Sequence, residues 1–259
     1  MCFDLDSRPP IDSIAGGSLD AGPITLTSAD GTEFRAFGAR PANPSGAGIL
    51  ILPDVRGLHP FFEELALRHA ERGIAAVAID YFGRTAGTTP QPDDFDHQPH
   101  VAACSWAGLE GDIRAGIEFL RSDAGGAPRS TFTTGFCMGG RLASLSATLG
   151  LGLSGVISFY GWPTGASRGT PAPADVADKI ECPVLALYGG ADQGISAEVR
   201  DAYDEALTAA HVEHKTVVYP DAPHSFFDRK AAEFAAASAL AWAEELAFIG
   251  AHTAGPTPA

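Results

Sequence analysis

The stretch at residues 134–141, with the sequence TGFCMGGR, constrains the fold of this chain more than any other feature. A β-branched run precedes it at residues 130–134, and residues 142–149 follow with apolar side chains at helical spacing. This order predicts a strand, a tight turn and a helix, with one glycine two residues before Cys137 and another two residues after it. So sharp a turn strains the backbone and brings the helix against the strand, which leaves no room for a Cβ at either flanking position.

Cys137 stands where a strand–turn–helix elbow of this kind presents a nucleophile. A thiol at the N-terminus of a helix lies at the positive end of the helix dipole, which favours the nucleophilic thiolate. The same residues also fit a small buried cysteine beside a glycine-rich turn. The motif leaves both interpretations open, and partner residues elsewhere in the chain are needed to choose between them.

Apolar runs of strand length alternate with helical patterns along most of the 259 residues. This alternation predicts an α/β fold with one doubly wound, mostly parallel sheet and helices on both faces. The first two strands should form a hairpin, residues 24–27 and 33–37. Buried parallel strands read as continuous apolar runs, and residues 48–52 and 74–79 have this profile. Further strands are expected at residues 130–134, 155–160, 183–188 and 215–219. Helices are expected at residues 60–72, 105–121, 142–149, 197–210 and 230–248.

These elements should form a single domain over residues 1–259, a length that α/β domains often reach. The polar, Gly/Pro-rich residues 1–22 are expected to be a surface arm, and residues 250–259 a loose C-terminal tail. Residues 80–101 and 161–175 lack periodicity and are rich in glycine and proline, so we expect two long loops. A long structureless segment inside a domain is usually functional, which makes the first of them a candidate active-site loop.

The formal net charge of −15 argues against binding of nucleic acid or an anionic membrane through bulk electrostatics. It also requires that any anionic substrate be met by local cations. The four cysteines have neither metal-ligand nor redox spacing, so we expect no metal, no cofactor and no disulfide. The N-terminus lacks the features of a signal peptide, and we see no membrane-spanning run. We therefore expect a cytoplasmic monomer or small homo-oligomer that acts on a small molecule.

Asp192 and His224 each follow a predicted strand, as Cys137 does, and should lie at the same edge of the sheet. Their order along the chain, nucleophile, acid and histidine, is that of the α/β-hydrolase triad. His224 would take the thiol proton, hold the thiolate as an ion pair, then protonate the leaving group and activate water, while Asp192 fixes its tautomer. The backbone N–H groups of Met138 and Val55 would form the oxyanion hole. Taken alone, Asp192 could be a turn residue and His224 a loop histidine.

The sequence resembles the dienelactone hydrolases, or carboxymethylenebutenolidases, a cysteine-nucleophile branch of the α/β hydrolases, from about residue 47 to residue 248. The resemblance rests on LPDVRGL at residues 52–58, DYFGR at 80–84, GFCMGG at 135–140, GGAD at 189–192 and APHSF at 222–226. It implies the α/β-hydrolase fold and the triad of Cys137, Asp192 and His224. It also implies that Arg84 holds a substrate carboxylate, and Ser225 matches the residue after the family's histidine. The alternative for Arg84 is an ion pair with acidic residues that only anchors the long loop.

Two positions depart from the family pattern. Asp54 stands where the family's type enzyme has a glutamate that contacts the resting cysteine, and we expect it to lie near the thiol and raise its pKa. Asp228 takes the place of a second carboxylate-binding arginine, and Arg229 follows it. Arg56 is a further candidate for contact with a substrate anion, or else a structural arginine.

Three functions remain open. The first is a cysteine hydrolase that cleaves an activated, carboxylate-bearing ester or lactone through a thioester. Good leaving groups such as enolates suit it, because a thiolate itself leaves readily from the tetrahedral intermediate. The second is a broad carboxylesterase, and the third is a non-catalytic binding protein on the same fold. An intact triad argues against the third.

Overall fold

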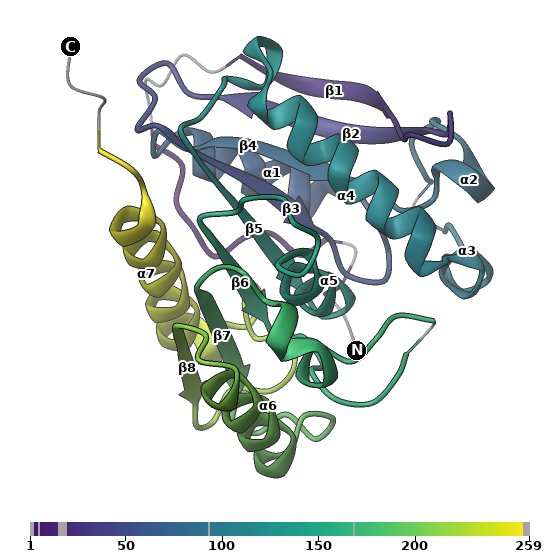
Figure 1. Cartoon of the computed structure of the whole chain (residues 1–259). Coiled ribbons are helices and arrows are strands. Elements are labelled where there is room, and N and C mark those ends of the chain that lie inside the picture. The colour runs from purple at the N-terminus through teal and green to yellow at the C-terminus, as the bar shows by residue number, and fades with distance from the viewer. Residues whose placement is uncertain (1–2, 5, 15–19, 93, 168, 256–259) are drawn as a thin grey trace.

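An eight-stranded β-sheet runs through the molecule, built from β1 (Asp20–Thr27), β2 (Glu33–Arg40), β3 (Ala47–Leu52), β4 (Ala75–Ile79), β5 (Ser130–Phe136), β6 (Gly155–Phe159), β7 (Val184–Gly189) and β8 (His214–Tyr219). Its order is β1-β2-β4-β3-β5-β6-β7-β8 (Figure 1). Strands β3 to β8 run parallel, whereas β1 and β2 form an antiparallel hairpin that joins the sheet through β4. The computed structural model describes residues 3–4, 6–14, 20–92, 94–167 and 169–255. The predicted mostly parallel α/β sheet is confirmed.

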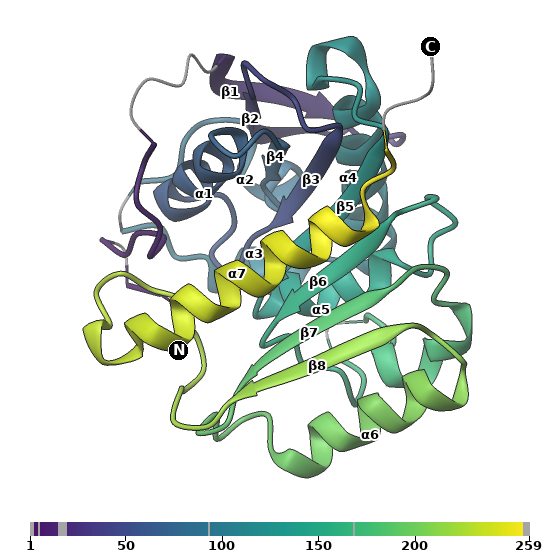
Figure 2. The same ribbon diagram turned by 90° about the vertical axis from the view of Figure 1, so that its left-hand side faces the viewer.

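The helices are α1 (Pro60–Ala70), α2 (Gly83–Ala86), α3 (Gln98–Ala103), α4 (Trp106–Arg121), α5 (Met138–Ser146), α6 (Ala197–Ala209) and α7 (Ala235–His252), with short 3₁₀ turns at Asp123–Gly125, Pro173–Lys179 and Ala232–Phe234. Helices α1 and α7 lie on one face of the sheet, and α4 and α5 lie on the other (Figure 2). Segment 80–101 is not structureless as expected, because it contains α2 and the start of α3. Helix α2 packs so closely on β2 that a Cβ on Gly83 would overlap the carbonyl of Glu33. That tertiary contact has no signature in the local sequence.

The central strands are buried on both faces because their side chains alternate between two apolar layers. In β3, Ile49 and Ile51 enter the layer beneath α1 and α7, and Leu50 and Leu52 enter the layer beneath α4 and α5. Every residue of β3 is buried, as is every residue of β5. The carboxyl ends of these parallel strands therefore stand on a rigid base, which fixes the loops that follow them.

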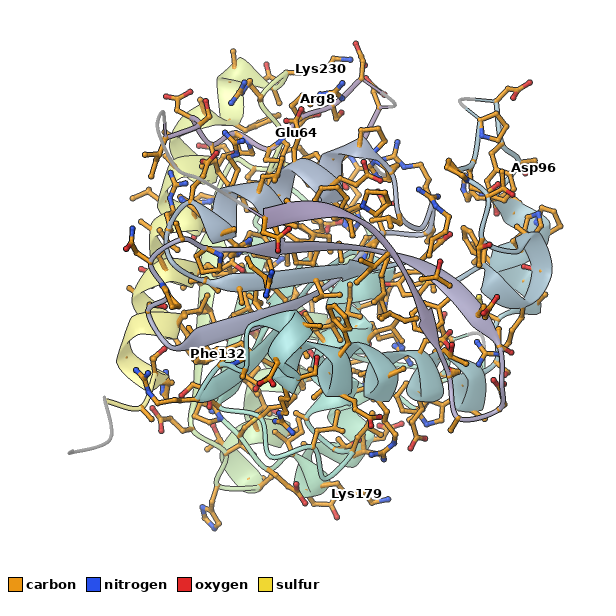
Figure 3. All side chains as sticks on the ribbon, turned by 90° about the horizontal axis from the view of Figure 1, so that it is seen from above. Arg8, Glu64, Asp96, Phe132, Lys179 and Lys230 are labelled. Atoms are coloured by element: carbon orange, nitrogen blue, oxygen red, sulfur yellow. The ribbon has the colours of Figure 1, made fainter. Side chains whose placement is uncertain are left out.

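The N-terminal residues do not form the surface arm that the sequence predicts. Phe3 is buried against Phe61, with ring centroids 4.2 Å apart, and Ile11 is buried in the same layer. Arg8 reaches Glu64 of α1 at 3.0 Å, and Lys230 lies 3.1 Å from Asp4; Figure 3 labels Arg8, Glu64 and Lys230. A few apolar side chains are thus enough to dock this polar segment on the core. The last residues of the predicted arm also belong to β1, which begins at Asp20. Residues 1–2, 5 and 15–19 of the predicted arm lie outside the described residues.

The C-terminal helix continues further than the sequence predicts. Helix α7 ends at His252, where Nδ1 lies 2.9 Å from the carbonyl oxygen of Phe248 and Nε2 lies 3.2 Å from Glu213. The Ala254 N–H then donates to Oγ of Ser130 at 2.8 Å. These contacts fix residues assigned to a loose tail, of which residues 256–259 lie outside the described part.

One segment, Ala232–His252, is long and apolar enough to cross a bilayer by length and composition alone, with a mean hydropathy of 1.3. By that criterion the expectation that the chain has no membrane-spanning run is wrong. In the fold, its α7 part lies along the sheet with Ala241, Trp242 and Ile249 buried in the core.

Candidate active site

The predicted elbow is present where β5 runs into α5 (Figure 1). Cys137 has φ 56° and ψ −112°, a strained conformation for a residue with a side chain, and it directly precedes the first residue of α5. A Cβ on Gly135 would overlap the carbonyl of Gly139, and a Cβ on Gly139 would overlap the carbonyl of Leu52. The Cys137 N–H donates to the carbonyl oxygen of Phe159 in β6 at 3.0 Å. Close backbone packing and one cross-strand bond therefore hold the thiol at the helix N-terminus.

Asp192 and His224 meet at the same edge of the sheet, in the loops that follow β7 and β8. Nδ1 of His224 lies 2.6 Å from Oδ2 of Asp192, and Oδ1 accepts the N–H groups of Gly194 at 2.8 Å and Ile195 at 3.2 Å. Burial raises the pKa of Asp192, but the bond from His224 and these N–H groups outweigh it and lower the pKa overall. Asp192 is therefore a carboxylate that accepts the Nδ1 proton, which leaves Nε2 to face the cavity.

His224 is coupled to Cys137 as well as to Asp192. Burial on its own would lower the pKa of the imidazole, but hydrogen bonds with Asp192 and Cys137, together with the charges of both, raise it to about 9. The ring of Tyr160 lies 5.0 Å from the imidazole, centroid to centroid. Because this pKa lies above neutral, His224 is an imidazolium at pH 7, next to the Asp192 carboxylate and the Cys137 sulfur.

A cavity of about 520 Å³ opens above these residues. Its lining combines Cys137 and His224 with the proposed oxyanion donors Met138 and Val55 and with apolar and loop residues: Cys104, Leu109, Arg141, Leu142, Tyr160, Trp162, Thr164, Gly165, Ala166, Ser167 and Thr170. Among the described residues, the Val55 N–H makes no hydrogen bond, so it can donate to a bound oxygen. Cys104, which the sequence gave no reason to place near Cys137, lines the same cavity. Cys182 is elsewhere, and burial raises the pKa of its thiol to about 12.

Asp54 is not among the residues that line this cavity, and its expected role beside the thiol stays a prediction. Its carboxylate, 1% exposed, binds Nη2 of Arg56 at 3.0 Å, accepts the Arg56 backbone N–H at 2.9 Å and lies 3.6 Å from Nε2 of His59. Burial raises the pKa of Asp54, but His59 and Arg56 together lower it below its ordinary value. Arg56 is likewise occupied, and with His59 it lines a separate cavity on the far side of Val55. The ion pair and the backbone bond between Asp54 and Arg56 stabilise the loop that carries Val55, which lies between them.

Arg84 also lies outside the Cys137 cavity. Its guanidinium binds Asp112 at 2.6 Å and Asp30 at 2.9 Å, and the buried carboxylate of Asp112 accepts a second bond from Ser28 at 2.5 Å. The structure therefore gives Arg84 the anchoring contacts that were its alternative, because carboxylates distant in sequence surround it. A charge neutralised in this way is poorly suited to recognise a substrate anion.

Ser225, Asp228 and Arg229 lie in the segment that follows β8. Ser225, expected to bind substrate, is not among the residues that line the cavity, and its φ of 57° is a strained value for a residue with a side chain. Asp228 is buried and accepts a bond from Ser7 at 2.7 Å. Arg229 donates to the carbonyl of Ile11 at 2.8 Å. Both thus serve to dock the N-terminal segment.

Arg141, a cavity-lining cation only 4% exposed, was not predicted as a site residue. A signal was present, because this arginine directly follows the elbow motif in a helix that is otherwise small and apolar. The loop at residues 162–170 was predicted as a loop, but its role as a wall of the cavity depends on tertiary contacts.

Comparison with known proteins agrees with this geometry. The model of the dienelactone hydrolase family matches residues 34–253. A Salmonella typhimurium protein named "Putative carboxymethylenebutenolidase" is 32% identical over 218 residues, which cover 81% of this chain and 79% of that protein. The carboxymethylenebutenolidase of Pseudomonas putida is 28% identical over 236 residues, covering 87% and 94% of the two chains.

A solved structure from Klebsiella pneumoniae, described as a "Putative Dienelactone Hydrolase", has the same fold. It superposes with a TM-score of 0.77 at 28% identity, over 90% of this chain and 99% of the other. The family match runs from β2 to α7, leaving out only β1 of the sheet, and it includes the elbow and both loops that bring Asp192 to His224. This chain belongs to the dienelactone hydrolase family of α/β hydrolases.

Proposed function

We propose that this chain is a cysteine hydrolase that cleaves an activated ester or lactone through a thioester acyl-enzyme. The observation that carries the proposal is that Cys137 and His224 line one cavity, while Asp192 holds His224 through its Nδ1 atom. The Val55 and Met138 N–H groups border the same cavity, where an oxyanion would form. Nucleophile, base, orienting acid and oxyanion donors are thus the four parts that acyl transfer needs.

In the proposed mechanism, His224 holds the Cys137 proton and the thiolate attacks the substrate carbonyl carbon. The carbonyl electron pair moves to oxygen, and the resulting oxyanion accepts the N–H groups of Met138 and Val55. Collapse of this intermediate expels the alcohol or enol oxygen, which takes the proton from His224 and leaves a thioester on Cys137. His224 then removes a proton from water, the hydroxide attacks the thioester, and the thiolate departs.

The preferred substrate should have a good leaving group. In the tetrahedral intermediate the thiolate competes with the other leaving group, so an enol or aryl oxygen leaves productively whereas an alkoxide or amine does not. The cavity, about 520 Å³ and bordered by Leu109, Leu142, Tyr160 and Trp162, suits a small, partly apolar molecule. Enol lactones and aryl esters therefore fit the site better than amides or simple alkyl esters.

The test is hydrolysis of a panel of enol lactones, aryl esters and alkyl esters by the purified protein. We expect turnover of the first two classes, loss of it in Cys137→Ala, and a covalent acyl mass on the Cys137 peptide when the reaction is quenched. An active Cys137→Ala variant would overturn the mechanism. Comparable rates on alkyl esters would instead favour a broad carboxylesterase, and binding without turnover would favour a non-catalytic role.

A further inference from the structure

Arg141 is a buried cation in the wall of the Cys137 cavity. It lies one helical turn after Cys137 in α5, and its backbone N–H donates to the Cys137 carbonyl at 3.2 Å. Helical side chains lean toward the N-terminus, so the residue four places on reaches back over the turn that carries the cysteine. Arg141 and Cys137 accordingly line the same cavity.

Neutral oxygens, and not carboxylates, satisfy the guanidinium. Nε donates to Oγ1 of Thr170 at 2.8 Å, and Nη1 donates to the carbonyl of Trp162 at 2.9 Å. Nη2 donates to the carbonyls of Gly165 and Pro171, both at 2.7 Å. These acceptors all belong to residues 162–171, the same segment that forms one side of the cavity, so Arg141 fixes that wall.

The positive charge of Arg141 is left largely unneutralised. Burial lowers the pKa of its guanidinium, and among the described residues the carboxylate that opposes this, Asp175, is exposed and acts through space. An arginine stays protonated even so. Arg84 is the opposite case, because two carboxylates bind it directly. In a protein with a net charge of −15, a buried cation without a bound carboxylate is a local exception.

We propose that Arg141 makes the Cys137 cavity selective for substrates that carry a carboxylate, and that it acts as a specificity and positioning residue. Its N–H groups are already used, so it attracts the anion through its charge across a low-dielectric cavity wall. The same charge stabilises the Cys137 thiolate and the oxyanion of the tetrahedral intermediate. This inference rests on the proposed function, since it assumes that Cys137 is the reacting group.

The test compares alkylation of Cys137 by iodoacetate and iodoacetamide, two reagents of similar size that differ in charge. Their rate ratio cancels the thiolate fraction and general access to the thiol, so it reports the electrostatic potential at the cavity. We expect Arg141→Gln to lower the iodoacetate-to-iodoacetamide ratio about tenfold, on the scale of one buried charge. Arg141→Lys keeps the charge without the planar fork and should keep the ratio within about twofold.

Arg114→Gln is the matched control, because it removes the same charge from an exposed arginine paired with Glu110. An unchanged ratio in Arg141→Gln, or an equal fall in Arg114→Gln, would overturn the inference. Failure of both reagents to label Cys137 in the wild-type protein would instead reject the proposed nucleophile, and the inference with it. Rates that fall equally for both reagents would mean that Arg141 only holds the wall.

A second measurement needs no variant. Benzoate and benzamide should be compared as protectants of Cys137 against iodoacetamide in the wild-type protein. We expect benzoate to protect at a concentration at least tenfold lower. Equal protection by the two compounds would contradict selectivity for a carboxylate even if Arg141→Gln failed to fold.

Discussion

The imidazole of His224 donates from Nδ1 to Oδ2 of Asp192 at 2.6 Å, joining residues that are 32 positions apart in the chain. The other carboxylate oxygen accepts two backbone N–H groups of the loop that follows β7. The loop N–H groups thus orient the Asp192 carboxylate, and the carboxylate in turn orients the His224 imidazole. The pair forms a preorganised acid–base unit beside the thiol.

The His224 imidazole should titrate near pH 9 in the wild-type protein, because Asp192 and Cys137 stabilise its charged form despite burial. The unfolded-state pKa is lower, about 6.5, so this interaction stabilises the fold fully below that pH. The contribution, roughly 3 kcal/mol from the size of the shift, is lost as the pH rises through about 9. NMR titration of the imidazole checks this. Asp192→Asn and Cys137→Ala should each lower the pKa, and a pKa near 6.5 in the wild type would contradict the coupling.

Asp54→Asn should reduce stability and leave the thiol titration unchanged. Its buried carboxylate pairs with Arg56, so the substitution leaves a mostly buried arginine without its partner, a loss of about 3 kcal/mol in the free energy of unfolding. Urea denaturation measures this. Glu110→Gln, which breaks an exposed pair with Arg114, should cost about 0.5 kcal/mol or less. A lowered thiol pKa in Asp54→Asn, seen in the pH dependence of iodoacetamide labelling, would restore the role expected from the sequence.

Arg84→Gln should affect carboxylate-bearing and neutral aryl esters equally. Its guanidinium anchors Asp30 and Asp112 outside the cavity, so any change in kcat/KM should come from the scaffold. The free energy of unfolding should fall by about 2 kcal/mol, because the buried Asp112 keeps only its bond from Ser28. Steady-state kinetics on a matched pair of esters decides the question: a loss confined to the carboxylate-bearing ester would reinstate Arg84 as the binding residue.

Gly139→Ala should destabilise the fold severely, since its Cβ would overlap the backbone carbonyls of Leu52 and Pro53. Backbone cannot move aside as a side chain can, and we expect a loss of about 3 kcal/mol or more. Gly250→Ala is the control: it lies in α7 with nothing within 4 Å of the new Cβ, and should gain about 0.5 to 1 kcal/mol from helix propensity. Thermal unfolding of both variants tests the close approach. A Gly139→Ala protein as stable as the wild type would show that the elbow relaxes.

The sequence determined the fold and the elbow because both depend on local patterns of apolar residues and glycines. Continuous apolar runs identify β3 and β4 as buried strands, since the side chains on both faces of such a strand are apolar. Glycines two residues either side of Cys137 identify the turn, since only they permit that backbone packing. Chain order then predicts that Asp192 and His224 share an edge of the sheet with Cys137, because parallel strands all end there.

Tertiary structure alone decided which charges are neutralised. Arg84 and Asp54 are of the residue types expected in an active site, but folding pairs each with an opposite charge. Arg84 pairs with Asp112, which is 28 positions away in the chain, and with Asp30, which is 54 positions away. Arg141 directly follows the elbow in sequence, but only the fold shows its surroundings: carbonyl groups from residues 162–171 bind it, and no carboxylate among the described residues does. A side chain's type is fixed by the sequence, whereas the potential that it creates depends on desolvation and on neighbours contributed by distant segments.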